Sequence, residues 1–305
     1  IRDSITTVPL EYAQYIIEID DTNVSVYNAE GTLKAQSSIA SEFWSLVRSD
    51  GNDIRVFDHL FNQLWFWVEK FDYANQVAKI FVRLPENSEE LNIAFGNEKA
   101  FESSYNSAEN TLEVFDDFED ADISDWEWSG GNLQISTDAY QGNYSLDQTV
   151  EALGNYHARK LKQVDLTDFV FEMAGKNYEG AGSITWAMVF SDWADGQAVD
   201  GICWNIAPST DKVYMTVETD GSHTDIDIGS YTSEYNTWYY GKWIKKGSSH
   251  KFWVNGSFIG EVTESTYTQF SYVGLQLYRQ CRYDIIKVYK LADPATFDTP
   301  RILEF

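Results

Sequence analysis

The chain has 305 residues, enough for two domains of ordinary size that each bury a hydrophobic core. Its 48 Asp and Glu residues outnumber its 22 Lys and Arg residues, so the formal net charge is −26. A surface this acidic repels phosphate backbones and anionic lipid headgroups, which disfavours roles on nucleic acids or at membrane surfaces. The carboxylates suit either solubility in salty water or the binding of hard cations such as Ca²⁺, and composition leaves both open.

Aromatic residues form 16% of the chain, which excludes a disordered polypeptide. Five Pro and 19 Gly separate segments rich in Val, Ile, Thr, Tyr and Trp, a composition typical of strands joined by tight turns. We therefore predict an all-β chain of two tandem β-sandwich domains, the second a jelly roll. No apolar stretch approaches the roughly 18 residues of a membrane-spanning helix, so membrane insertion is not expected.

The first domain is expected over residues 1–110. Partly alternating apolar patterns predict its strands, and a short helix is expected at 41–47. The sequence then becomes polar and loses periodicity between residues 98 and 112, which indicates a domain junction. The predicted strands are 15–19, 24–27, 54–57, 64–70, 77–84 and 91–95.

The second domain is expected over residues 111–292, where short strands recur with turn signals between them, as in a sandwich or jelly roll. The dipeptide Asn255-Gly256 predicts a type I′ hairpin, because both central positions of that turn need positive φ. Residues 293–305 are expected to form an irregular tail or linker. The strands expected here include 183–190, 201–206, 212–218, 237–244, 250–254, 258–262 and 283–289.

Four ordered segments of the first domain carry a family resemblance: 48–58 (RSDGNDIRVFD), 65–69 (WFWVE), 80–85 (IFVRLP) and 94–97 (AFGN). Together they resemble the extracellular β-sandwich family called domain of unknown function 2341. The chain lacks the Trp-rich opening typical of that family, so its first strand is expected to differ.

The second domain resembles concanavalin-like and laminin-G-like jelly rolls and the related carbohydrate-binding modules. The segments that carry this resemblance are 117–120 (DFED), Trp126, 139–146 (AYQGNYSL), 253–258 (WVNGSF) and 284–289 (DIIKVY). In jelly rolls of this kind an early acidic residue meets an Asp of the last strand around a structural Ca²⁺. The resemblance therefore implies a calcium site, and a solvated acidic loop is the alternative. Its candidate ligands are Asp117, Glu119, Asp138, Asn143 and Asp284.

Exposed aromatic side chains on a sheet make platforms for sugar rings, since their flat apolar faces match the C–H faces of sugars. Trp193, which lies between Asp192 and Asp195, is the first candidate for such a carbohydrate-binding residue, with Trp186 and Trp204 next. For any single Trp, burial in the core is the competing interpretation.

Cys203 and Cys281 are the only cysteines, so one disulfide between them is possible, and two buried free thiols are the alternative. Asn23, Asn143 and Asn255 each begin an N-x-S/T triplet, the acceptor sequence for glycosylation of secreted proteins. The first residue is Ile1 rather than Met, as in a processed secretory precursor. These features favour an extracellular or cell-surface location.

Catalytic motifs are missing from the sequence. No strand carries the Glu-x-Asp-x-Glu pattern that would align carboxylates for glycoside hydrolysis, and the four His residues are isolated. We therefore predict a non-enzymatic structural or adhesive surface protein that self-assembles into a filament or surface layer as a homo-oligomer or homopolymer, with strands exchanged between neighbours. The alternative is a secreted pair of carbohydrate-binding modules from a larger adhesin or glycan-degrading enzyme.

Overall fold

The computed structural model describes residues 12–85, 91–130, 132–149, 156–178, 184–194, 197–198, 200–220, 222–277, 280–291 and 301–304. For residues 156, 184–186, 194, 197–198 and 301–304 it describes the backbone only. The chain forms two compact units. The N-terminal unit comprises Ile1–Glu113 and Tyr289–Phe305, and the jelly-roll unit comprises Val114–Val288.

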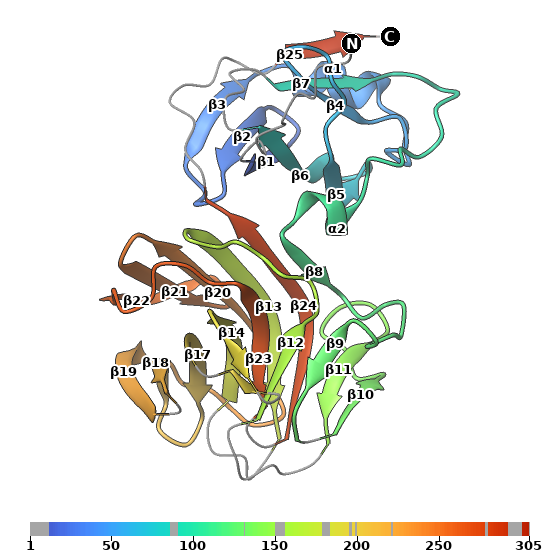
Figure 1. Ribbon diagram of the computed structural model, residues 1–305. Helices are drawn as coiled ribbons and strands as arrows, with labels where there is room; N and C mark the ends of the chain where they lie inside the picture. Colours follow the sequence, from blue (N-terminus) through green and yellow to red (C-terminus); the bar gives the residue numbers. More distant parts are fainter. Residues whose placement is uncertain are drawn as a thin grey trace, which may run out of the picture. The chain divides into compact units, whose positions relative to one another are not determined.

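The N-terminal unit is a small β-sandwich (Figure 1). One sheet has five strands in the order β3-β2-β1-β6-β5, and the other has three in the order β25-β7-β4. The strands are β1 (Tyr12–Ile19), β2 (Val24–Asn28), β3 (Leu33–Ser37), β4 (Arg55–Asp58), β5 (Phe66–Asp72), β6 (Val77–Pro85), β7 (Leu91–Phe95) and β25 (Arg301–Glu304).

Apolar residues at alternate positions of the two sheets meet in the core of this unit, where Ile17 and Val82 of the larger sheet join Ile93 of the smaller one. Helix α1 (Ala40–Leu46) adds Phe43 and Trp44 to the same core. A second short helix, α2 (Ala108–Thr111), follows the loop after β7. None of the helices in the described part of the chain is long and apolar enough to cross a bilayer.

The expectation of an irregular tail at 293–305 needs a correction at residues 301–304, whereas 293–300 and 305 lie outside the described residues. Arg301–Glu304 form β25, which pairs in parallel with β7 of the N-terminal unit, with Ile302 opposite Ile93. The end of the chain therefore contributes to the unit in which the chain begins. Open backbone hydrogen bonds at the edge of β7 give this segment a partner that its local sequence does not indicate.

The jelly-roll unit consists of two sheets packed face to face (Figure 1). An eight-stranded sheet has the order β10-β11-β24-β13-β20-β21-β22, with β8 pairing to β24, and a seven-stranded sheet has the order β19-β18-β17-β14-β23-β12-β9. Phe171 and Trp243 of the first sheet pack in the same core as Trp204, Val189 and Leu275 of the second. The predicted all-β fold with a second jelly-roll domain is confirmed.

The strands of the eight-stranded sheet are β8 (Val114–Asp116), β10 (Leu133–Ser136), β11 (Ser145–Gln148), β13 (Phe169–Asn177), β20 (Trp238–Lys246), β21 (Ser249–Val254), β22 (Ser257–Thr263) and β24 (Cys281–Lys290). Those of the seven-stranded sheet are β9 (Trp126–Trp128), β12 (Tyr156–Lys160), β14 (Ile184–Phe190), β17 (Gly201–Ala207), β18 (Lys212–Thr219), β19 (Ser222–Ser230) and β23 (Tyr272–Leu277). A short hairpin, β15 (Trp193–Ala194) and β16 (Gln197–Ala198), follows β14.

The predicted hairpin at Asn255-Gly256 is present between β21 and β22, where Val254 faces Ser257. Asn255 has φ +47° and Gly256 φ +77°, as a type I′ turn requires. Asn255 also fixes the turn from outside, because its Oδ1 accepts the Tyr240 N–H at 2.8 Å. Turn chemistry therefore sets the register of this edge of the sheet.

Candidate functional site

The outer face of the seven-stranded sheet is built by strict alternation along its strands. On β12, Ala158 enters the core, so His157 and Arg159 point to the opposite side. On β23, Leu275 enters the core and Gln276 faces outward beside His157, its partner in the ladder. The same rule places Glu218 of β18 on this outer face, because Val217 packs toward the core.

This outer face is concave. His157 lies on β12 and Glu218 on β18. Three strands, β23, β14 and β17, lie between them in the sheet. On a flat sheet those strands would lie about 19 Å apart at a strand spacing of roughly 4.8 Å. The His157 Nε2 and Glu218 Oε2 atoms are nevertheless 3.5 Å apart. The sheet must curve toward this side, and we call this surface the concave face.

A buried polar network lines the concave face. Gln276 Nε2 donates to Glu218 Oε1 at 3.2 Å, and the Cys203 thiol donates to Gln276 Oε1 at 3.4 Å. Asn205 Nδ2 donates to Thr216 Oγ1 at 3.4 Å. The side-chain oxygen of Asn205 is buried and has no hydrogen-bond partner among the described residues. A buried acceptor without a donor costs about 1–3 kcal/mol, which a ligand that supplies the donor would recover.

Aromatic rings continue the concave face toward solvent. Phe190 stacks on Trp193 with ring centroids 5.6 Å apart and on Tyr272 at 5.4 Å. Gly274 lies on β23, between β14 and β12. A Cβ there would lie 2.1 Å from the Ala158 carbonyl oxygen and 2.8 Å from the Phe190 ring, so only glycine fits beside both. Phe190 is fully buried, whereas Trp193 and Tyr272 are half-buried, so the latter two form the accessible edge of the cluster.

A guanidinium group is held against these rings. The Arg159 guanidinium lies 4.9 Å from the Trp193 ring centroid and 4.6 Å from that of Tyr272. Arg159 Nε and Nη2 both donate to Glu127 Oε2, at 2.9 and 2.6 Å. Gln163 Nε2 donates to the Tyr272 hydroxyl at 2.9 Å. Flat rings and hydrogen-bonding groups with fixed positions therefore lie side by side at the accessible edge.

The three Trp residues predicted to bind carbohydrate have different environments. Trp193 is half-buried at the accessible edge of the concave face, and its role in binding carbohydrate stays a prediction. Trp204 is fully buried between the two sheets, because alternation along β17 directs its side chain into the core. The prediction that Trp204 binds carbohydrate is therefore wrong. The side chain of Trp186 lies outside the described residues.

Two of the five predicted calcium ligands meet at one turn. Glu119 Oε1 accepts the N–H groups of Asn143 and Tyr144 at 2.7 and 2.8 Å. Asp284 Oδ2 accepts those of Tyr140 and Gln141 at 2.8 and 3.0 Å. Burial raises the pKa of Asp284 to about 6, and the charge of Glu119 adds to that effect. Two carboxylates that repel each other beside a turn form part of the oxygen-rich set that Ca²⁺ requires.

The other three predicted ligands have different partners. Asp138 forms ion pairs with Lys176 and Arg282, so its charge is already matched. Asn143 donates its side-chain amide to Glu119 at 2.8 Å, and Asp117 accepts the Glu119 N–H at 3.3 Å. Within the described residues, no group of three or more His, Cys, Asp or Glu side chains gathers as a metal site. Backbone carbonyls would have to complete any calcium shell.

Both cysteines are free and buried rather than joined in the disulfide considered from the sequence. The Cys281 Sγ hydrogen-bonds the Tyr283 hydroxyl at 2.8 Å, on the core side of the eight-stranded sheet, whereas Cys203 lies on the concave face. Burial raises the pKa of Cys281 to about 12 and that of Cys203 well above its ordinary value, so both thiols stay protonated. The alternative of two buried thiols describes the structure.

The three glycosylation candidates all lie in or beside turns. Asn143 and Asn255 are exposed, and Asn23 is half-buried beside the turn that joins β1 and β2. The Asn255 amide nitrogen donates to the Tyr231 hydroxyl at 3.3 Å, and that of Asn23 to Thr22 Oγ1 at 2.7 Å. Glycan attachment stays a prediction at each position.

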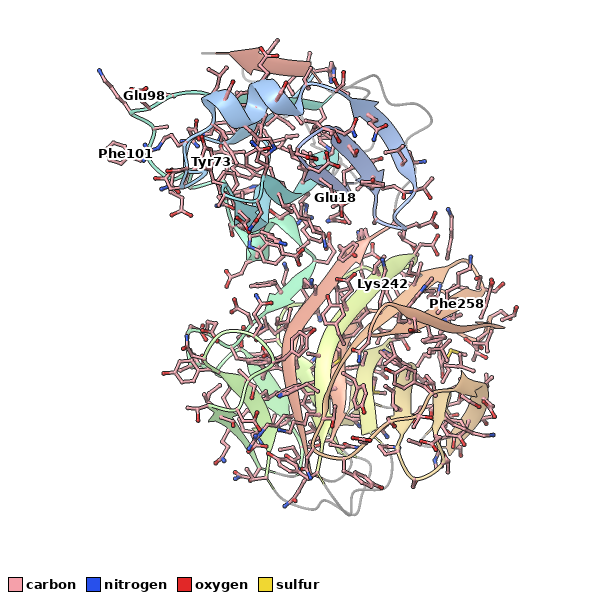
Figure 2. All side chains as sticks on the ribbon, turned by 180° about the vertical axis from the view of Figure 1, so that it is seen from behind. Glu18, Tyr73, Glu98, Phe101, Lys242 and Phe258 are labelled. Carbon is pink, nitrogen blue, oxygen red and sulfur yellow. The ribbon has the colours of Figure 1, made fainter. Side chains whose placement is uncertain are left out.

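The residues that the first family resemblance rests on have structural roles in the N-terminal unit. The Asp53 carboxylate accepts the N–H groups of Arg48 and Gly96, at 3.1 and 2.7 Å, and so joins two of the resembling segments. Arg55 donates to the Phe101 carbonyl at 2.6 Å. Phe101 itself is 89% exposed and projects from the loop between β7 and α2, as Figure 2 shows.

Comparison with known proteins agrees with this resemblance. The family model described as domain of unknown function (DUF2341) matches residues 50–130, less than half of the chain. Comparison with curated protein sequences finds no match.

Several solved structures are similar to part of this chain, with low sequence identity. The carbohydrate-binding module CBM66 from Bacillus subtilis has 15% identity and a TM-score of 0.46, over 55% of this chain and 97% of that one. Domain 4 of an extracellular arabinanase from Geobacillus stearothermophilus, in complex with arabinotriose, has 12% identity and a TM-score of 0.42, over 60% and 95%. A Bacillus licheniformis β-glucanase has 14% identity and a TM-score of 0.44, over 59% and 98%. Likeness at this level carries no information on the ligand of this chain.

Sequence reasoning missed the residues that line the concave face. Arg159, Glu218 and Gln276 lie on three different strands, and none belongs to a local motif. The sequence contains one relevant signal: His157 and Arg159 flank Ala158 in the alternating pattern of a half-buried strand. That pattern identifies outward positions without showing which strands face one another.

Proposed function

We propose that the jelly-roll unit is a non-catalytic glycan-binding module whose site is the concave face. The observation that supports this most is the approach of Glu218, on β18, to His157 and Gln276 on the distant paired strands β12 and β23, beside the stacked rings of Trp193 and Tyr272. Buried polar groups on the outside of a sheet are not needed to hold the core together.

The chemistry of this face suits a sugar ring. Half-buried aromatic rings stack on the C–H faces of sugars, while fixed polar groups beside them bond the hydroxyls. Sugar hydroxyls both donate and accept, so they can bond the Arg159 guanidinium, the Glu218 carboxylate and the Asn205 carbonyl oxygen alike.

A hydrolytic role is less well supported. Glycosidases use two carboxylates on either side of the scissile bond, one of them free to act as an acid. Glu218 is bound by His157 and Gln276, and no second buried carboxylate lies on the concave face among the described residues. We therefore keep the expectation of a non-enzymatic protein and favour the carbohydrate-binding module, which was the alternative drawn from the sequence.

A glycan array tests the proposal. We expect selective binding by the whole chain and a loss of at least about tenfold in affinity for Trp193→Ala, equivalent to roughly 1.4 kcal/mol. Trp65→Ala is the matched control, since Trp65 is an exposed Trp of the N-terminal unit, 36% accessible. A silent array, or equal losses in the two variants, would overturn the proposal.

A self-assembling surface subunit is the second candidate function. Pairing of β25 with β7 favours it, because a terminal segment that pairs at a sheet edge can occupy the same edge of a neighbouring copy. Removal of residues 301–305 should abolish such assembly without altering glycan binding. Light scattering over a dilution series that finds a monomer at every concentration would refute it.

Extracellular location and a structural calcium ion belong to the same proposal. The three N-x-S/T triplets support the location, and mass spectrometry of native material would identify glycans at Asn23, Asn143 or Asn255. The carboxylates of Glu119 and Asp284 would hold the ion together with backbone carbonyls, and its chemistry would be to neutralise their charges.

A further inference from the structure

The charges of the concave face are unevenly balanced. The Arg159 guanidinium is already paired with the Glu127 carboxylate, and the Glu218 carboxylate lies 3.5 Å from the His157 imidazole. Asp225 adds a further carboxylate on the exposed outer strand, where it accepts the Thr216 hydroxyl at 2.7 Å. An anionic ligand would therefore meet a compensated guanidinium and additional negative charge.

Arg159 is held in one orientation. The rings of Trp193 and Tyr272 pack against its guanidinium, and Glu127 accepts two of its N–H groups through a single oxygen. The Arg159 side chain is 18% exposed and that of Glu127 42% exposed, so the pair lies where a ligand can reach it. A guanidinium neutralised in this way presents hydrogen-bond donors without a net charge.

We propose that the Glu127–Arg159 pair makes the concave face selective for uncharged glycans, with Glu127 as the residue that sets this selectivity. The inference rests on the proposed glycan-binding function and names the ligand class of the same site. Sugar hydroxyls bond a neutralised guanidinium well, whereas a uronate or sulfate group gains little from it and is repelled by Glu218 and Asp225.

The test uses the full chain on an array that prints each neutral oligosaccharide beside its counterpart oxidised to the uronic acid at C6. We expect the wild type to bind neutral members at least tenfold more tightly than their acidic counterparts. Glu127→Gln keeps the shape of the side chain but leaves the charge of Arg159 uncompensated. This variant should raise the ratio of acidic to neutral binding by roughly tenfold at low salt, and the gain should shrink as salt screens the charge.

Two further variants separate charge from folding. Glu127→Asp retains the negative charge and should keep the wild-type ratio. Glu69→Gln removes the same charge from an ion pair of the N-terminal unit, Lys79–Glu69 at 2.7 Å, and should leave the ratio unchanged. Two results would overturn this inference while leaving glycan binding intact. One is that the wild type binds acidic oligosaccharides as tightly as neutral ones, and the other is that Glu127→Gln leaves the ratio of acidic to neutral binding unchanged. A silent array would instead overturn the proposed function, and this inference with it.

Discussion

The two outer faces of the jelly-roll unit obey the same alternation but differ in how their polar groups are matched. On the eight-stranded sheet, Glu172 pairs with Lys287 at 3.1 Å and Lys242 at 3.8 Å, and accepts the Tyr240 hydroxyl at 2.7 Å. Figure 2 shows Lys242 on this part of the unit, in the same β20–β22 region as Phe258. On the concave face, Asn205 retains an acceptor without a donor. Matched charges stabilise the first face, whereas the second keeps bonding capacity for a ligand.

The largest expected effect distinguishes core from surface Trp residues. Trp204→Ala should lower the free energy of unfolding by about 3–5 kcal/mol, because it opens a cavity between the sheets. Trp193→Ala removes a half-buried ring and should lower it by less than about 2 kcal/mol. Urea denaturation followed by circular dichroism checks both values. Equal losses would mean that Trp193 belongs to the core.

The next effect tests the matched charges of the eight-stranded sheet. Glu172→Gln should lower the free energy of unfolding by about 3 kcal/mol, since it leaves the ammonium of Lys287, only 5% exposed, without its carboxylate. The Glu127→Gln variant of the concave face should lose less than about 1 kcal/mol, as expected for a more exposed pair. The same denaturation experiment compares them, and a reversed order would contradict the contrast between the faces.

A smaller effect concerns the unmatched acceptor. Asn205→Leu should leave stability unchanged or raise it by up to about 1 kcal/mol, because it removes a buried oxygen that lacks a donor. The same variant should weaken glycan binding about tenfold, because the ligand then loses an acceptor. Calorimetric titration and denaturation together show whether stability and binding change in opposite directions. A large loss of stability would show that Asn205 is structural.

The smallest effect concerns the turn held by Glu119 and Asp284. Because burial raises the pKa of Asp284 to about 6, the folded state keeps this proton between about pH 4 and pH 6, where the unfolded chain has lost it. Stability from this group therefore falls as pH rises through that window. Calcium would favour the ionised carboxylates, so it should raise the melting temperature by roughly 2–4 °C at pH 7 and by less at pH 5.

Differential scanning calorimetry with calcium or with a chelator measures this effect. Asp284→Asn is the control, since it cannot ionise and should flatten the pH profile. A melting temperature that calcium leaves unchanged at both pH values would remove the calcium proposal.

Local chemistry was sufficient to predict several elements of this protein. The apolar pattern of residues 77–84 predicted β6, and Asn255-Gly256 predicted its hairpin because few other dipeptides accept two positive φ angles. By contrast, β13 was not singled out, since all but one of its residues are buried and no alternation marks its two faces.

Tertiary structure alone decided the candidate site and the fate of its Trp residues. Composition and turn residues predicted an all-β chain, because strand and turn preferences are properties of neighbouring residues. Which strand lies beside which, and how far a sheet curves, depends on contacts between residues distant in sequence. The approach of His157 to Glu218, the place of Trp204 between the sheets and the return of β25 to β7 are all such contacts.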